Sequence, residues 1–124
     1  MHCQILICDQ IRVEQKRHIL GKVINSVSVP VFPYMIQFSL LLKIYEIPEG
    51  EDILTEFRVV DAEGRVLGSP GTFVHRNYRD AQAVPGVDQN FDLKVLVEDE
   101  GNIFLECYIN QEKKNWYPIH VKAG

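Results

Sequence analysis

One turn signature occurs twice in this chain and constrains its fold more than any other feature. Residues 60–66 (VDAEGRV) and residues 97–103 (VEDEGNI) each place a three-residue loop ending in glycine between two apolar runs. Three-residue hairpin loops consist of a type I turn followed by one left-handed residue, a conformation that glycine adopts at little cost. The repeated signature therefore predicts an antiparallel all-β protein.

Apolar and polar residues alternate along several segments, which is the period-two pattern of half-buried strands. In the clearest example, Ile36, Phe38, Leu40, Leu42 and Ile44 form one apolar face. The pattern predicts eight strands, at about residues 2–8, 17–29, 34–45, 53–60, 65–75, 90–97, 103–110 and 116–122. Eight strands in 124 residues predict one domain, 1–124, built as an antiparallel two-sheet β-sandwich, with a barrel as the alternative.

The last three predicted strands allow their register to be worked out by arithmetic. A hairpin that pairs Val97 with Ile103 also pairs Val95 with Leu105, and it keeps every apolar side chain on one face. The same requirement gives the final hairpin an odd loop, of three or five residues within 111–115. The sequence thus predicts a three-stranded meander at the end of the chain.

Several short motifs, taken in order, are similar to those of a known group of proteins. The residues concerned are Ile7-Cys8-Asp9, Ile19-Leu20-Gly21, Val29-Pro30-Val31-Phe32-Pro33, Asp61, Gly64, Asp88-Gln89 and Pro118-Ile119-His120-Val121. This order resembles an uncharacterised family of small bacterial proteins with a predicted immunoglobulin-like or C2-like β-sandwich fold. The resemblance spans nearly the whole chain and implies a fold. It implies no activity.

Charge and cysteine content limit the classes of function. A formal net charge of -4 argues against a nucleic-acid partner, which would require a basic face. The longest apolar run, Leu40-Leu41-Leu42, is too short to cross a membrane, and the first residues lack the pattern of a signal peptide. Three cysteines, an odd number, fit a reducing compartment, so we expect a cytoplasmic protein.

The three cysteines and four histidines show no spacing typical of a metal site. Cys3 and Cys8 are five positions apart and should point to opposite faces of one strand, while Cys107 alternates with apolar neighbours. We therefore interpret all three as small buried apolar residues and expect neither a metal nor a cofactor.

The sequence contains no catalytic motif, and this favours a non-enzymatic module that binds a protein or a small ligand. The alternative is a metal-dependent module or an enzyme that uses loops at one end of the sandwich. Acidic residues in the turns at 61–63 and 98–100 should gather at one end, and Asp9, residues 49–52 and Asp88 at the other. Several carboxylates on adjacent loops are what a calcium ion requires.

A ligand site is predicted in the long connection 76–90. Arg76, Tyr78 and Arg79 offer planar, charged and stacking groups that suit carboxylates, phosphates or aromatic rings. The alternative is a solvated loop whose arginines pair with nearby acids.

A protein interface is predicted on the outer face of the final hairpin. Phe104, Tyr108 and Trp116 alternate away from the inward residues, so three aromatic side chains should share that face. Met35, Leu41 and Tyr45 form a second apolar outer stripe, on the long strand 34–45. A contiguous apolar patch is typical of an interface, so a homodimer or another partner is expected there. The alternative is that a loop folds over the aromatic residues.

Overall fold

The computed structural model describes residues 1–48, 50–76 and 86–124, and within these ranges it contains strands and turns but no helix. None of the described residues forms a helical segment that could cross a lipid bilayer. The strands are β1 (His2–Cys8), β2 (Ile11–Glu14), β3 (Arg17–Leu20), β4 (Ser26–Val29), β5 (Tyr34–Tyr45), β6 (Asp52–Asp61), β7 (Val66–Arg76), β8 (Gly86–Val97), β9 (Gly101–Ile109) and β10 (Glu112–Ala123). The all-β prediction is therefore confirmed.

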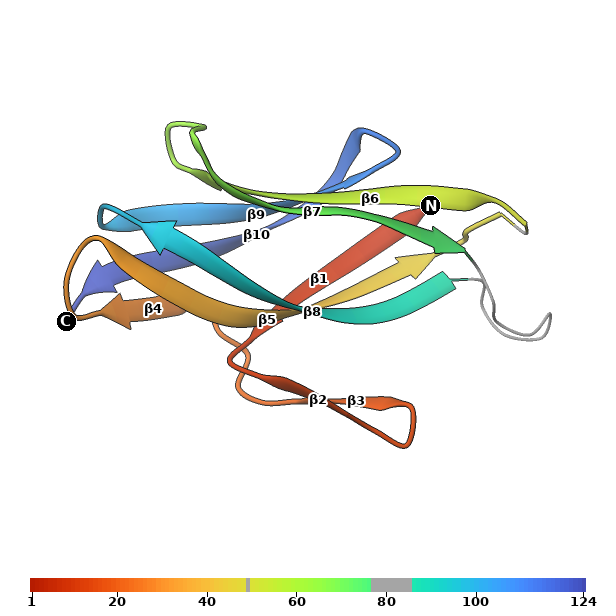
Figure 1. The fold of residues 1–124 in the computed structure, drawn as a ribbon, viewed down its shortest axis with the longest axis horizontal. Helices are drawn as coiled ribbons and strands as arrows, with labels where there is room; N and C mark the ends of the chain where they lie inside the picture. The colour runs from red at the N-terminus through yellow and green to blue at the C-terminus, as the bar shows by residue number, and fades with distance from the viewer. Residues whose placement is uncertain (49, 77–85) are drawn as a thin grey trace.

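The strands form three sheets. One has the order β1-β5-β8, a second has the order β4-β10-β9-β6-β7, and β2 and β3 form a separate hairpin. Figure 1 shows the five-stranded sheet lying over the three-stranded sheet, with the hairpin on the far side of the smaller sheet. The strand number was predicted incorrectly, because the predicted strand 17–29 is divided into β3 and β4 and because β2 lies outside the predicted strands. The purely antiparallel arrangement was also incorrect, because β4 pairs in parallel with β10.

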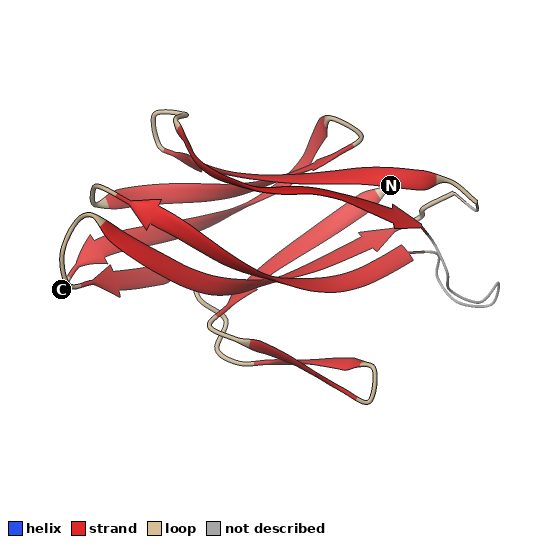
Figure 2. Cartoon of the chain, in the orientation of Figure 1, coloured by secondary structure: helices blue, strands red, loops and turns tan. Residues whose placement is uncertain are grey.

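The core lies between the two larger sheets and is filled by the inward residues of both. On β5, Ile36, Phe38, Leu40, Leu42 and Ile44 are all at most 3% exposed, as the alternation predicts. An aromatic cluster joins the two sheets, with Phe57 on β6 and Phe91 on β8 at a ring-centroid distance of 5.2 Å. Phe73 on β7 lies 4.6 Å from Phe91 and completes the cluster. Figure 2 shows the strands of the two larger sheets in two layers, with the small β2–β3 hairpin apart from them.

The predicted meander is wrong at its first turn. β8 pairs with β5 along its whole length, whereas β9 pairs with β6 and β10. The turn at 98–100 therefore carries the chain from one sheet to the other, and Val97 and Ile103 are both buried without being a hairpin pair. Apolar residues on both flanks of a turn face the core in a hairpin and in a crossover alike, so alternation could not distinguish the two.

The other two predicted hairpins exist. At the first signature, β6 pairs with β7, Gly64 has a φ of 85°, and the Asp61 carboxylate accepts hydrogen bonds from the backbone N–H groups of Glu63 and Arg65. The last hairpin has a two-residue turn, Asn110-Gln111, with positive φ at both residues. A bulge between Lys113 and Asn115 supplies the odd residue that the prediction had assigned to the loop.

Candidate functional site

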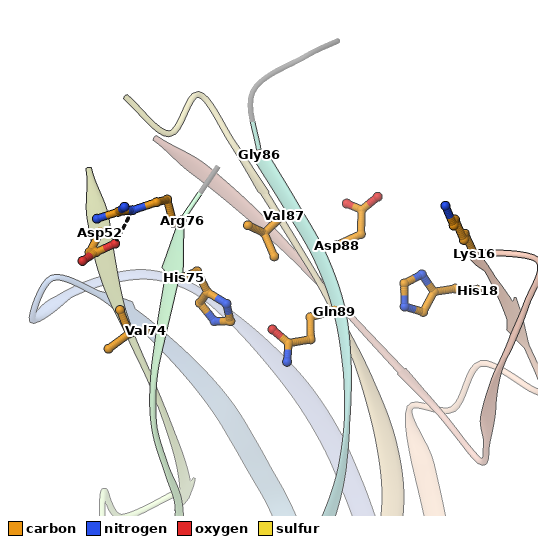
Figure 3. Close-up of a pocket in the computed structure, with 10 residues that line it drawn as sticks. All are labelled: Lys16, His18, Asp52, Val74, His75, Arg76, Gly86, Val87, Asp88 and Gln89. Carbon is orange, nitrogen blue, oxygen red and sulfur yellow. Dashed lines mark hydrogen bonds and ion pairs between the residues drawn. The ribbon is translucent and has the colours of Figure 1, made fainter. Parts of the chain in front are cut away.

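A groove opens between the two sheets where β7 and β8, each at the edge of its own sheet, lie beside one another. Its volume is about 530 Å³. Figure 3 shows its lining, with β7 on one side, β8 in the middle and the β2–β3 hairpin on the other side. The lining residues are Lys16, His18, Asp52, Val74, His75, Arg76, Gly86, Val87, Asp88 and Gln89.

Two polar side chains interrupt the apolar inward faces of β7 and β8 at this groove. His75 pairs with Ile53, which is buried, and Gln89 pairs with Leu42, which is fully buried, so both face inward. Their inward neighbours are aromatic or aliphatic, with Phe73 on β7 and Phe91 on β8. In Figure 3 the His75 ring and the Gln89 carboxamide both point into the space between β7 and β8.

His75 is the most unusual residue of the groove. Its side chain is buried, at 7% exposed, and its Nε2 atom has no hydrogen-bond partner among the described residues. Burial lowers the pKa of His75, so the ring is neutral at physiological pH. The ring centroid of Phe91 lies 6.5 Å away, which gives the imidazole an apolar side. A buried polar atom without a partner is rare in folded proteins and requires an explanation.

Asp52, Arg76 and Asp88, three of the charged residues that line the groove, are each paired with an opposite charge. Arg76 donates a hydrogen bond from Nε to Asp52 at 2.7 Å, and Asp88 lies 3.6 Å from Lys43. Lys16 and His18 come from the β2–β3 hairpin on the opposite side. The centre of the groove therefore offers a neutral imidazole and a carboxamide, each able to donate and to accept a hydrogen bond. This chemistry suits hydroxyl and amide groups better than a formal charge.

The predicted ligand residues are only partly described. Arg76 lines the groove, but its guanidinium is engaged with Asp52. Tyr78 and Arg79 lie outside the described residues. His75 was expected only as the end of a strand, and Gln89 was expected in the long connection 76–90 without being named as a ligand residue. The available signal was a polar residue at an inward position, as in Gln89 between Val87 and Phe91.

The predicted interface residues share the outer face of the five-stranded sheet. Phe104 and Trp116 contact one another at 5.7 Å between ring centroids, and the Arg58 guanidinium lies 4.5 Å above the Tyr108 ring. Trp116 is 52% exposed, so no described segment covers it. The bulge in β10 pairs Trp116 with Glu106 and Phe104 with Pro118.

The two acidic turns do meet at one end of the molecule, around a smaller hollow of about 100 Å³. Arg65 lies among these acids, 2.7 Å from Asp61 and 3.6 Å from Glu63. The Arg65 guanidinium and neighbouring backbone N–H groups lower the pKa of Asp61 against the opposing effect of desolvation. No cluster of three or more metal-ligating side chains occurs among the residues that the structure describes.

Comparison with known proteins gives little information about function. No known family model matches the chain, and no curated protein matches it. Among solved structures, the chain is similar to "Pseudomonas fluorescens alkylpurine DNA glycosylase AlkC bound to DNA containing an abasic site analog", with a TM-score of 0.42 and 11% identity. The match covers 96% of this chain and 30% of that one. We draw no conclusion from a likeness at this level, and the resemblance to a family of small bacterial proteins stays a prediction.

Proposed function

We propose that this chain is a non-enzymatic binding module, a two-sheet β-sandwich whose groove between β7 and β8 takes a small neutral polar ligand. The observation that carries the proposal is the buried residue His75, which lines the groove and whose Nε2 atom has no hydrogen-bond partner among the described residues. A ligand hydroxyl or amide would supply the missing hydrogen bond. The odd number of cysteines supports a cytoplasmic location for the module.

The size and lining of the groove support the same proposal. Its volume of about 530 Å³ lies within the range of small-molecule sites. Such sites combine apolar walls with a few polar groups that fix the ligand's orientation. Here Val74 and Val87 supply apolar surface, and His75 and Gln89 supply the polar groups. Candidate ligands are therefore sugars, nucleosides and small amides.

We expect a thermal-melting screen with sugars, nucleosides and amino-acid amides to find a ligand that stabilises the wild-type protein. A ligand at 100 times its Kd would raise the free energy of unfolding by about 2.7 kcal/mol. The His75→Phe variant keeps the aromatic volume but removes the hydrogen bond, so its binding should weaken at least tenfold, a loss of about 1.4 kcal/mol.

The matched control for this screen is His120→Phe. His120 is an exposed histidine on β10, hydrogen-bonded to Asn102 and remote from the lining of the groove. This variant should bind as the wild type does. Equal binding by the wild type and His75→Phe would place the ligand elsewhere and overturn the assignment of the groove.

A second proposal concerns the outer aromatic face, defined by Phe104, Tyr108 and Trp116, for which a second copy of this chain is the partner. The charges on this face are already paired, Arg58 with Glu56 and Lys113 with Glu106, each at 2.9 Å. A face of exposed aromatic surface and internally neutralised charge presents no net repulsion to its own copy.

Trp116→Ala is expected to weaken self-association at least tenfold, because an exposed tryptophan at the centre of an interface is a typical binding hot spot. Sedimentation equilibrium over a wide concentration range measures this change. Val13→Ala, an exposed position on β2 in the separate β2–β3 hairpin, is the control and should leave association unchanged. A wild type that stays monomeric at high concentration would eliminate the homodimer.

The alternative of a metal-dependent module or an enzyme uses the acidic turns at 61–63 and 98–100. Arg65 already supplies a positive charge to this cluster, which opposes a cation there. We therefore expect calcium and zinc to leave the melting temperature unchanged, and a reproducible increase with either metal would favour the alternative.

A further inference from the structure

Two cysteines from different sheets meet in the core. Cys3 lies on β1 and Cys107 lies on β9, and both belong to the cluster of buried residues between the sheets. The two thiols lie close enough to each other to change each other's acidity. The backbone confirms their proximity, because the Cys3 carbonyl accepts a hydrogen bond of 2.9 Å from Asn115 Nδ2, and Asn115 is the cross-strand partner of Cys107.

The two thiols differ in access to solvent. Cys3 is 7% exposed and lines a shallow surface hollow together with His2, Tyr45 and Glu46. Cys107 is fully buried behind it. β1 is also the edge strand of its sheet, with β5 as its neighbour on one side. A small oxidant therefore crosses less protein to reach Cys3 than to reach Cys107.

The two thiols also differ in acidity. The hydrogen bond from Cys107 and the nearby charge of Lys114 lower the pKa of Cys3, against an opposing effect of burial. The same hydrogen bond and burial raise the pKa of Cys107. The thiolate is the species that reacts with peroxide. This difference in acidity makes Cys3 the thiol that attacks peroxide, and Cys107 the thiol that then attacks the oxidised Cys3 sulfur.

We propose that Cys3 and Cys107 are a peroxide-reactive pair that closes into a disulfide between the two sheets. In the first step, the Cys3 thiolate attacks one oxygen of hydrogen peroxide, the O–O bond breaks, and Cys3 sulfenic acid and hydroxide form. In the second step, the Cys107 sulfur attacks the Cys3 sulfur, the S–O bond breaks, and water leaves. The sum is two thiols and one peroxide giving one disulfide and two waters.

Cys8 provides an internal comparison within the same chain. It pairs with Ser39 on the opposite face of the smaller sheet, outside the core cluster, and it is fully buried. Burial and the charge of Asp9 raise its pKa, which makes it a poor nucleophile. Cys8 should therefore remain a free thiol under conditions that oxidise Cys3.

The test is a titration of the full chain with hydrogen peroxide, followed by alkylation and mass spectrometry. The expected product is a single chain without a disulfide to another chain, and it is lighter by two hydrogen atoms. It contains a peptide pair linked through Cys3 and Cys107, while Cys8 is alkylated. The disulfide should raise the melting temperature by about 10 °C, because it closes a loop of about 100 residues, and a reductant should reverse the increase.

Three variants separate the steps. Cys8→Ser should form the same disulfide as the wild type. Cys107→Ser should stop at the sulfenic acid, which dimedone traps on Cys3, and Cys107→Ala serves the same purpose if the serine variant fails to fold. Cys3→Ser should form neither product. Three results would overturn the proposal. These are a disulfide that involves Cys8, a disulfide that forms only between molecules, and the absence of both a disulfide and a sulfenic acid at Cys3.

Discussion

Replacement of Phe57 by alanine is expected to lower the free energy of unfolding by about 4 kcal/mol, the range measured for deleting a buried phenylalanine. Phe57 is fully buried on β6 and contacts Phe91 on β8 and Phe73 on β7, at 5.2 Å and 6.2 Å between ring centroids. Its ring therefore joins the two larger sheets. Alanine would lose both contacts and leave a cavity that strands fixed by backbone pairing cannot fill.

Chemical denaturation of the variant measures this loss. The control is Val66→Ala on β7, whose side chain is 58% exposed, and its effect should stay within about 0.5 kcal/mol. A loss below about 1.5 kcal/mol for Phe57→Ala would mean that the two sheets are not held together by this aromatic cluster.

Replacement of His75 by phenylalanine is expected to act in the opposite direction and raise the free energy of unfolding by about 1–2 kcal/mol at neutral pH. The variant removes a buried Nε2 atom that has no hydrogen-bond partner among the described residues, and such an atom costs about 1–3 kcal/mol. Residues that lower the stability of the folded state in this way are typical of functional sites.

The same substitution should reduce the loss of stability in acid. Burial lowers the folded-state pKa of His75 below its unfolded value of about 6.5. Between these two pKa values, the unfolded chain binds a proton at His75 and the folded chain does not. Stability is then fully present above pH 6.5 and declines as the pH falls from there toward the folded-state pKa. In His75→Phe this contribution to the decline is absent.

Denaturation curves between pH 7.5 and pH 5 for the wild type, His75→Phe and His120→Phe compare these slopes. The difference between the wild type and His75→Phe should grow as the pH falls. A variant that is less stable than the wild type at neutral pH would show that the His75 ring is held by a favourable interaction, and a constant difference would show that His75 does not titrate on unfolding.

The period of the apolar residues was sufficient to predict the strands but not their pairing. The boundaries of β1 and β5 were predicted to the residue, because long alternating runs end at turn residues or prolines there. The pairing of β8 with β9 was predicted incorrectly, because an inward face is the same whether the next strand is a neighbour or lies in the facing sheet. Only contacts distant in sequence, such as β5 with β8, distinguish these arrangements.

The candidate site was less predictable, because it is formed by two strands that share no sheet. Arg76, which lines the groove, was named from the sequence because it is a planar, charged residue in the long connection 76–90. His75 and Gln89 were missed because a single polar residue at an inward position has no distinctive spacing. The Cys3–Cys107 pair was missed for the same reason, since the two residues are far apart in the chain and come together only through the packing of the sheets.

The most direct test of the proposed binding function is a map of amide chemical shifts in two-dimensional ¹H–¹⁵N NMR spectra, recorded with and without the ligand from the melting screen. We expect the largest changes at His75, Val87 and Gln89, and we expect them to disappear in His75→Phe while His120→Phe retains them. Changes confined to the outer aromatic face around Trp116, or to the turns at Asp61 and Glu98, would contradict the proposal that the ligand binds in the groove between β7 and β8.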